Sequence, residues 1–179
     1  RKALTETNGD FEAAIDWLRK QGQKIAAKRS DREAKEGVII AQTTADNKTG
    51  IAVCVSCETD FVSKNADFVA FAQSIADAAI ANNVKSVEEL NEVSINGTKV
   101  SELINDKLAA IGEKIGITNV SRVDADFVAS YIHGAYRMGV LVGFNGEAAA
   151  VGRDIAMQIA AMNPLAVDPD SVSEEVVAR

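Results

Sequence analysis

The alternation of apolar and polar positions predicts a β-hairpin in the first third of the chain. Residues 38–44 and 51–57 have the apolar, β-branched composition of strands, and residues 45–50 between them are turn formers. Consecutive strands joined by a short turn usually pair with each other, so these two runs should form one antiparallel hairpin.

Positions with a helical period follow the hairpin. Residues 68–81 have apolar side chains at spacings of three and four, which predicts an amphipathic helix. The candidate core positions of this helix are Phe68, Phe71, Ile75 and Ala79. A polar segment over residues 82–99 leads to a helix predicted over residues 100–112, and a strand over residues 117–123 completes the unit.

The N-terminal segment has a helical period of its own. Asp10 is placed to cap a helix over residues 11–21, in which apolar positions recur at spacings of three and four. These positions are Phe11, Ala14, Ile15 and Leu18. Gly22 suits a C-terminal cap, and a further short helix is predicted over residues 23–29. This segment is typical of the remainder of a three-helix bundle.

The second half of the chain repeats the pattern of the first. A strand and turn over residues 129–134 lead to residues 139–144, which match residues 50–55. The helical pattern over residues 155–163 then matches residues 75–83. This order predicts two related α+β units, each made of a hairpin followed by a helix.

The two copies differ in the separation between strand and helix. Gly50 and Ile75 are 25 positions apart, whereas Gly139 and Ile155 are 16 positions apart. We therefore expect nine extra residues between the strand and the helix of the first copy. An insertion that the second copy lacks is not needed for the fold, which favours a role in binding.

The polar triplet Glu58-Thr59-Asp60 and the aromatic Phe61 come directly after the apolar strand, and Thr59, Asp60 and Phe61 lie within this excess. No helical pattern begins until about residues 65–67, so we expect an irregular connection that presents a carboxylate beside a phenyl ring. Two interpretations of Phe61 stay open at this point. The ring is either a core aromatic at the start of a helix or an exposed group that enters another molecule.

The composition excludes several classes of function. Lys plus Arg number 19 and Asp plus Glu number 26, and the net charge of −7 argues against nonspecific binding of nucleic acid. Aromatic residues make up 5% of the chain, too few for base-stacking platforms. No apolar run is long enough to cross a bilayer. Arg1 and Arg179 both fall within helical patterns, so we expect a fragment of a longer protein.

Cys54 and Cys57 form a C-x-x-C pair, a spacing found in redox and zinc sites. Within a strand, residues i and i+3 point to opposite faces, so the two sulfur atoms should diverge. One histidine and no second cysteine pair leave too few ligands for zinc. We expect two reduced thiols, and a redox protein that uses both cysteines is the alternative.

Two further features allow more than one interpretation. The basic residues between Arg19 and Lys35 belong either to a solvated linker helix or to a strip that contacts an acidic partner protein. His133 is the only histidine, and a lone histidine is most often a structural hydrogen-bonding group. Its place at a strand end, before Gly134, is also compatible with exposure and a functional contact.

One segment, Cys57-Glu58-Thr59-Asp60-Phe61-Val62, is highly specific, because it combines a Thr-Asp-Phe-Val motif with the exit from a strand. The supporting segments, in chain order, are residues 2–6, Asn8-Gly9-Asp10, Ala26-Ala27-Lys28, Glu36-Gly37, residues 130–134 and residues 139–142. In this order they resemble the bacterial elongation factor Ts family, the guanine nucleotide exchange factors for elongation factor Tu. The resemblance covers essentially the whole chain.

The resemblance implies an α+β fold. A partial N-terminal three-helix module, similar to ubiquitin-associated domains, would be followed by two related hairpin-plus-helix subdomains. We expect the module at residues 1–29, a linker at residues 30–36, the first core subdomain at residues 37–123 and the second, incomplete, at residues 124–179. Many family members insert a coiled-coil hairpin into the second subdomain, and this chain ends where that hairpin would begin.

The resemblance also implies site residues. In the family, the Thr-Asp-Phe-Val segment enters the partner GTPase beside its magnesium and nucleotide site, and the matching residues are Thr59, Asp60, Phe61 and Val62. His133 matches a histidine that contacts the partner's nucleotide-binding domain. The implied function is to promote GDP release by stabilising the nucleotide-free state, with no catalytic residues, no metal site and no cofactor.

The expected partner is elongation factor Tu, in a hetero-complex whose stoichiometry, including two copies of each protein, stays open. We expect no direct nucleic-acid partner, no membrane partner and a cytoplasmic location, with bacterial and organellar origins both open. A non-exchanging adaptor that docks on partners is the second hypothesis, and the thiol redox protein is the third.

Overall fold

The computed structural model describes residues 1–29, 31–173 and 176 of the chain. The helices are α1 (Lys2–Glu6), α2 (Phe11–Arg29), α3 (Asp60–Ser63), α4 (Ala66–Ala81), α5 (Val87–Glu92), α6 (Val100–Ile111) and α7 (Gly152–Met162), with a 3₁₀ turn, η1 (Pro169–Ser171). The strands are β1 (Glu36–Thr43), β2 (Thr49–Cys57), β3 (Ser94–Ile95), β4 (Thr98–Lys99), β5 (Gly116–Asp124), β6 (Phe127–His133) and β7 (Met138–Phe144). This mixture confirms the α+β class. The helical pattern expected at the C-terminus falls largely outside the described residues.

The predicted β1–β2 hairpin forms the centre of the molecule, and β5 pairs with the other side of β2. Because side chains alternate across a strand, Val38, Ile40 and Val53 point to one face, where all three are inaccessible to solvent. Helices α4 and α6 cover this face and contribute Phe68 and Ile104 to the same core. Of the core positions predicted on α4, three are buried and Phe71 is half-buried.

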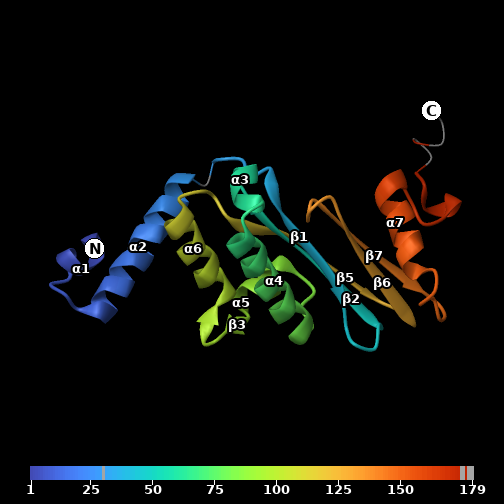
Figure 1. Cartoon of the computed structure of the whole chain (residues 1–179), viewed down its shortest axis with the longest axis horizontal. Coiled ribbons are helices and arrows are strands. Elements are labelled where there is room, and N and C mark those ends of the chain that lie inside the picture. Colours follow the sequence, from blue (N-terminus) through green and yellow to red (C-terminus); the bar gives the residue numbers. More distant parts are fainter. Residues whose placement is uncertain (30, 174–175, 177–179) are drawn as a thin grey trace.

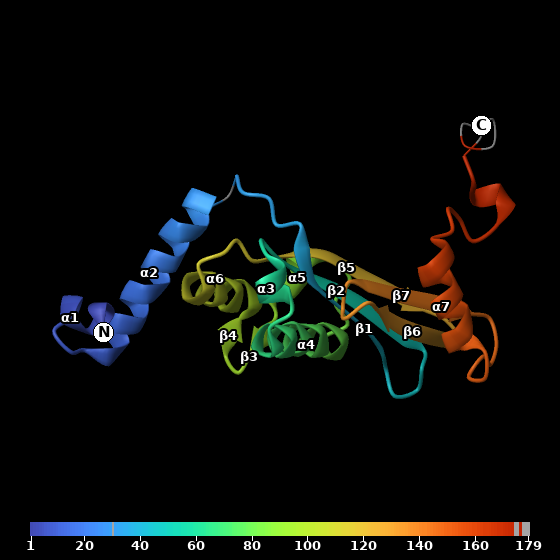
Figure 2. The same ribbon diagram turned by 45° about the horizontal axis from the view of Figure 1, so that its top comes forward.

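The opposite face of this sheet contacts the antiparallel β6–β7 hairpin, and α7 packs on the far side of that hairpin (Figure 2). A Cβ atom added to Gly139 of β7 would lie 2.7 Å from Ile39 Cγ2 and 3.1 Å from Ala41 Cβ. Glycine at this position therefore allows the hairpin to approach β1 closely. The molecule is elongated, with α1 and α2 at one end and α7 at the other (Figure 1).

One continuous helix, α2, occupies the segment in which two helices are predicted. Asp10 caps it as predicted, since its Oδ1 accepts a hydrogen bond from the backbone N–H of Ala13 at 2.9 Å. The predicted C-terminal cap at Gly22 is wrong. Gly22 lies inside α2, where an added Cβ would be 3.0 Å from the Cβ of Ala109 in α6. This glycine permits two helices to cross closely and does not end one.

The apolar stripe predicted on α2 is buried only at Ala14. The other three positions are exposed, namely Phe11, Ile15 and Leu18. The second half of α2 makes the tertiary contact instead, because Ile25 and Ala26 pack against the central core. The N-terminal segment is therefore joined to the first sheet unit through the second half of α2, while Ile15 and Leu18 of the predicted stripe line an open groove against α6.

The polar segment over residues 82–99 contains a helix and a small hairpin, α5 and β3–β4, which its pattern does not predict. Ser86 begins α5, and its hydroxyl accepts a hydrogen bond from the backbone N–H of Glu89 at 3.2 Å. Leu90 is its buried residue. A six-residue helix with one buried side chain is too short to show a helical period.

Both halves of the chain contain a hairpin followed by a helix that packs on both of its strands, as the internal repeat predicts. The predicted insertion of nine residues is wrong, because the two connections, residues 58–65 and 145–151, differ in length by one residue. Most of the difference in spacing arises within the helices. Ile75 lies more than two turns into α4, whereas Ile155 lies in the first turn of α7.

Candidate functional site

The predicted site residues Thr59, Asp60, Phe61 and Val62, here called the 59–62 segment, lie where the chain leaves β2. A single helical turn, α3, replaces the predicted irregular connection. The backbone N–H groups of Ser63 and Lys64 donate to the carbonyl oxygens of Thr59 and Asp60 at 3.2 and 3.0 Å. Four residues are too few to show a helical period, which is why the pattern misses this turn.

Phe61 is 85% exposed, whereas Phe68, seven residues later, is 1% exposed. The interpretation of Phe61 as a core aromatic is therefore wrong. A ring with this exposure adds little to the packing of its own chain, and burial against another molecule would remove its apolar surface from water. Val62 is half-buried and packs against the central core, so it anchors the turn from which Phe61 projects.

Asp60 supplies a negative charge next to the exposed ring. Its Oδ2 accepts a hydrogen bond from Lys64 Nζ at 2.7 Å. The hydrogen bond and positive charge of Lys64 lower the pKa of Asp60, and the charge of Arg137 adds to this effect. The carboxyl group is therefore ionised at neutral pH.

Thr59 is held by a glutamate from a distant part of the chain. Glu113 lies between α6 and β5, and its Oε2 accepts hydrogen bonds from the backbone N–H groups of Glu58 and Thr59, both at 3.1 Å. Its Oε1 accepts a hydrogen bond from the Thr59 hydroxyl at 2.6 Å. Thr59 is the N-cap residue of α3, yet its hydroxyl is directed to Glu113 and not to the α3 backbone.

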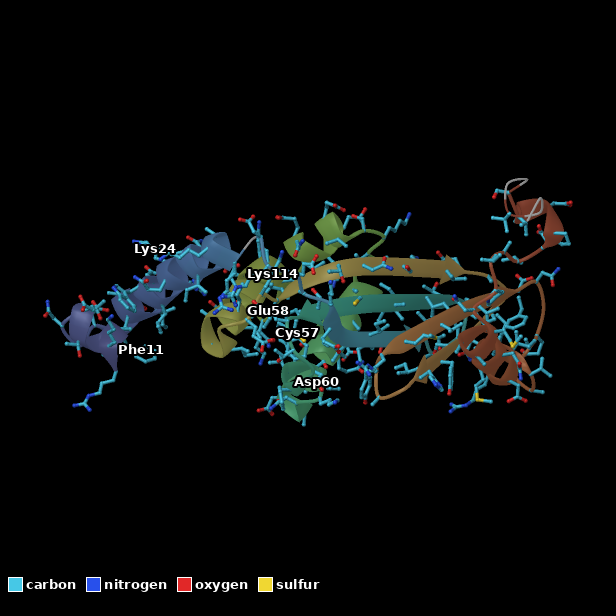
Figure 3. All side chains as sticks on the ribbon, turned by 90° about the horizontal axis from the view of Figure 1, so that it is seen from above. Phe11, Lys24, Cys57, Glu58, Asp60 and Lys114 are labelled. Atoms are coloured by element: carbon cyan, nitrogen blue, oxygen red, sulfur yellow. The ribbon has the colours of Figure 1, made fainter. Side chains whose placement is uncertain are left out.

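Glu58 is bound through both carboxylate oxygens. Its Oε1 accepts from the backbone N–H of Lys114 at 2.6 Å and from Arg29 Nη1 at 3.0 Å, and its Oε2 accepts from Arg32 Nη1 at 3.0 Å. The Lys114 N–H contributes most to lowering the pKa of Glu58, and the two arginines reinforce it. Figure 3 shows Glu58 and Lys114 close together near the end of α2, with Asp60 farther from that helix.

Five residues of the predicted basic run fall into two groups. Arg29, which is half-buried, and Arg32, whose side chain is 55% exposed, both pair with Glu58. Lys20, Lys24 and Lys28 recur every four residues on an exposed side of α2. The run is therefore partly an internal contact, which neither of the two interpretations predicts.

Cys54 and Cys57 are both free thiols. Cys57 is buried in the central core, whereas Cys54 lines a cavity on the opposite face of the sheet that Met138 also lines. This confirms the predicted divergence of the two side chains. Burial, together with the charge of Glu113, raises the pKa of Cys57 to about 11. A thiol with this pKa is almost fully protonated at neutral pH and is a poor nucleophile, which disfavours the redox hypothesis.

His133 is the last residue of β6, and it is exposed. Its Nδ1 lies 3.0 Å from the hydroxyl of Tyr131. The turn that follows has left-handed backbone at Ala135 and Tyr136, with φ angles of 54° and 70°. The carbonyl oxygen of Tyr136 accepts a hydrogen bond from Ile39 N–H at 2.8 Å. The tip of the β6–β7 hairpin is therefore attached to β1.

Arg137, at the tip of the β6–β7 hairpin, interacts with residues near the 59–62 segment. Its Nη2 lies 3.1 Å from a carboxylate oxygen of Glu36, and Glu36 is paired with Cys57 in the β1–β2 register. The charge of Arg137 also acts on Asp60. The 59–62 segment and the hairpin tip after His133 thus lie near the same open end of the β1–β2 hairpin (Figure 1).

The residues that hold this site are Glu58 and Glu113. Sequence patterns place Glu58 beside the site without showing its supporting role, and they do not identify Glu113. Glu113 is 54 positions from Thr59, so no local spacing relates the two. The one available signal is the basic run, because buried or half-buried arginines need acidic partners. The run alone does not show which of the 26 acidic residues pairs with Arg29 and Arg32.

In the part of the chain that the structure describes, no group of three or more His, Cys, Asp and Glu side chains could hold a metal ion. Among the same residues, no helix combines the length and the apolar character needed to cross a membrane. The groups presented at the site are an exposed phenyl ring, an ionised carboxylate and an exposed imidazole. These groups suit a contact surface.

Comparisons with known proteins agree on one family. A sequence model described as elongation factor TS matches residues 58–179. Proteins named elongation factor Ts from Phocaeicola vulgatus, Methylococcus capsulatus and Christiangramia forsetii are 43%, 45% and 41% identical over 98%, 100% and 100% of this chain. The alignments cover 53%, 62% and 66% of those relatives, so the chain spans about half to two thirds of their length. The chain belongs to the elongation factor Ts family.

Proposed function

We propose that this protein promotes the release of GDP from elongation factor Tu. Membership of the elongation factor Ts family supports the choice of partner. One observation carries the proposal: Phe61 is 85% exposed beside the ionised Asp60, on a turn held by glutamates. An exposed aromatic ring on a fixed backbone is suited to insertion into a pocket of another protein.

Phe61 enters the partner next to its magnesium ion and separates helices there. Burial of a phenyl ring contributes about 1.5–3 kcal/mol, enough to compensate for part of the displacement. In GTPases, Mg²⁺ bridges phosphate oxygens and protein ligands, so moving a helix that supports the metal weakens the hold on GDP. Asp60 adds negative charge that disturbs the water shell of the metal, Thr59 braces the turn, and Val62 adds apolar contact at its base.

His133 contacts the nucleotide-binding domain of the same partner. Its exposed position at the end of β6 and the attachment of the hairpin tip to β1 support a contact on the same side of the molecule as Phe61. This second contact would shift the loop that binds the phosphates while Phe61 acts at the metal.

The exchange activity needs no covalent chemistry. A factor that binds the nucleotide-free partner more tightly than the GDP-bound partner accelerates release through this difference in affinity alone. Thermodynamic linkage makes the effect reciprocal, so GDP weakens binding of the factor by the same ratio as the factor weakens binding of GDP.

The organisation of the chain follows from the same proposal. Residues 1–29 are the helical module, residues 30–36 the linker, residues 37–123 the first core subdomain and residues 124–179 part of the second. The repeated order of hairpin and helix supports the two core subdomains. We place the protein in the cytoplasm, where translation elongation takes place, in a hetero-complex with its GTPase.

The test is a GDP-release assay on elongation factor Tu loaded with a fluorescent GDP analogue. Wild-type protein should accelerate release, and a variant with both Asp60→Ala and Phe61→Ala should lose most of this effect while its circular dichroism spectrum stays unchanged. Equal release with and without the wild-type protein would refute the exchange function. Binding to the GTPase without any change in release rate would support the adaptor hypothesis instead.

A further inference from the structure

We propose that Glu113 is a positioning residue that sets the direction in which Phe61 projects. The inference rests on the proposed function, because it assigns to Glu113 the task of presenting the 59–62 segment to the partner. The hydrogen bonds of Glu113 go to Glu58 and Thr59 and not to Phe61. It acts through the backbone and hydroxyl of Thr59, at the start of the turn that bears the ring.

An exposed ring cannot be oriented by packing. Phe61 is 85% exposed, so its direction depends on the backbone of α3. That helix has four residues and one turn of hydrogen bonds, and a helix of this length is not stable by itself. Its geometry is therefore set by the rest of the chain, through Val62, which packs against the central core, and through Thr59 at the start of the turn.

Glu113 supplies this external support with three hydrogen bonds to consecutive residues. Two backbone N–H groups, of Glu58 and Thr59, converge on one carboxylate oxygen, and the Thr59 hydroxyl binds the other. Hydrogen bonds to an ionised acceptor are about twice as strong as those between neutral groups. Bonds to two adjacent amides fix both the position and the orientation of the peptide plane before α3.

Thr59 does not make the hydrogen bond that is usual for a threonine at an N-cap. A threonine at the N-cap position normally accepts a hydrogen bond from its own helix, which stabilises the helix. The Thr59 hydroxyl instead donates to Glu113, 54 positions away. Positions where a local rule is set aside tend to be functional sites. The Thr59 hydroxyl is therefore used to attach α3 to the α6–β5 connection and not to cap α3.

A second carboxylate makes the attachment mutual. Glu58 accepts a hydrogen bond from the backbone N–H of Lys114, the residue after Glu113, at 2.6 Å. Each of the two connections thus offers a glutamate to the backbone of the other. Arg29 and Arg32 neutralise the charge of Glu58 and extend the attachment to the end of α2. Glu113 is the member of this pair that binds directly to Thr59.

The experiment compares Glu113→Ala with Glu113→Gln in the full chain. Alanine removes all three hydrogen bonds. Glutamine keeps an oxygen for the two backbone N–H groups and presents an NH₂ group to the Thr59 hydroxyl, which can also accept a hydrogen bond. Glu89→Ala is the matched control, because Glu89, in the first turn of α5, also accepts a hydrogen bond from a backbone N–H, that of Lys85 at 2.8 Å, far along the chain from Thr59.

Three quantities are measured for each protein. They are the maximal rate of stimulated GDP release, the concentration of factor that gives half of that rate, and the hydrogen exchange of the amides of residues 58–63. For Glu113→Ala we expect a maximal rate about 10- to 100-fold lower, because a misdirected Phe61 ring loses most of the apolar burial that it gains in the partner. The half-maximal concentration should change much less, and the amides of Glu58 and Thr59 should lose protection.

Glu113→Gln should restore the maximal rate to within about threefold of wild type, and Glu89→Ala should match wild type. An unchanged rate in Glu113→Ala would overturn the inference while leaving the proposed function intact. Equal losses in Glu113→Ala and Glu89→Ala would also overturn it, because the effect would then reflect general stability. If wild-type protein fails to accelerate release, the proposed function fails first and the inference falls with it.

Discussion

The two connections that lead from a hairpin to its helix have nearly the same length and opposite properties. Residues 58–65 lead from β2 to α4, and residues 145–151 lead from β7 to α7. The first is held by glutamates that bind across long stretches of the chain. The second is held locally, since Glu147 binds the backbone N–H of Ala149 at 2.8 Å, only two residues away.

This difference shows that the candidate site is not an insertion. The scaffold provides a connection of similar size in both halves, and only the first half equips it with a projecting aromatic ring and long-range support. In the second connection Ala148 is buried and Val151 is 50% exposed. The distinction between the two halves lies in side-chain chemistry and not in the number of residues.

The largest expected effect comes from removing the ring. Phe61→Ala should lower stimulated GDP release by about 10- to 150-fold, which corresponds to loss of about 1.5–3 kcal/mol of apolar burial in the partner. The free energy of unfolding should change by less than about 0.5 kcal/mol, because an exposed ring supports little of the fold. Stopped-flow release of a labelled nucleotide and urea denaturation measure the two quantities.

The second connection provides the matched control for this change. Val151→Ala removes an exposed apolar side chain from the second connection, where Val151 is the N-cap residue of α7. It should leave both nucleotide release and stability close to wild type. If Val151→Ala slows release as much as Phe61→Ala does, the two connections share the function and the contrast between them is incorrect.

The next effect concerns the support of each connection. Glu58→Ala leaves the N–H of Lys114 and two guanidinium groups without their acceptor, and loss of such partners costs about 1–3 kcal/mol. Glu147→Ala removes one exposed local hydrogen bond and should cost less than about 1 kcal/mol. Urea midpoints of the two variants measure the difference. Equal costs would show that the long-range attachment adds nothing to the fold.

Most of the regular elements were predictable, because each extends over several periods. The strand patterns identify β1, β2, β5, β6 and β7, and the spacing of three and four identifies the first part of α2 and α4. The short turns α3 and α5 escape, since four or six residues contain too few buried positions. Gly22 misleads because glycine serves both to end a helix and to let two helices cross.

The exposed residue of the candidate site, Phe61, was predictable, whereas the glutamates that support it were not. The order of polar and aromatic residues after a strand points to Phe61, although the insertion used to support that prediction does not exist. The supporting glutamates depend on contacts between residues 54 or more positions apart, and no periodicity encodes such contacts. Long-range pairing of charges is decided by the assembled fold.

The smallest expected effect is a pH dependence specific to the first connection. The pKa of Glu58 is lowered from 4.5 in the folded state, chiefly by the N–H of Lys114 and the two arginines. A lowered pKa means that the ionised carboxylate stabilises the fold above about pH 4.5 and that this stabilisation is lost as the pH falls through the folded value. The difference in unfolding free energy between wild type and Glu58→Gln should therefore be largest near neutral pH and shrink below pH 4.5. Carboxylates elsewhere titrate in both proteins and cancel in this difference, so a gap that stays constant down to pH 3 would mean that Glu58 acts through its shape and not its charge.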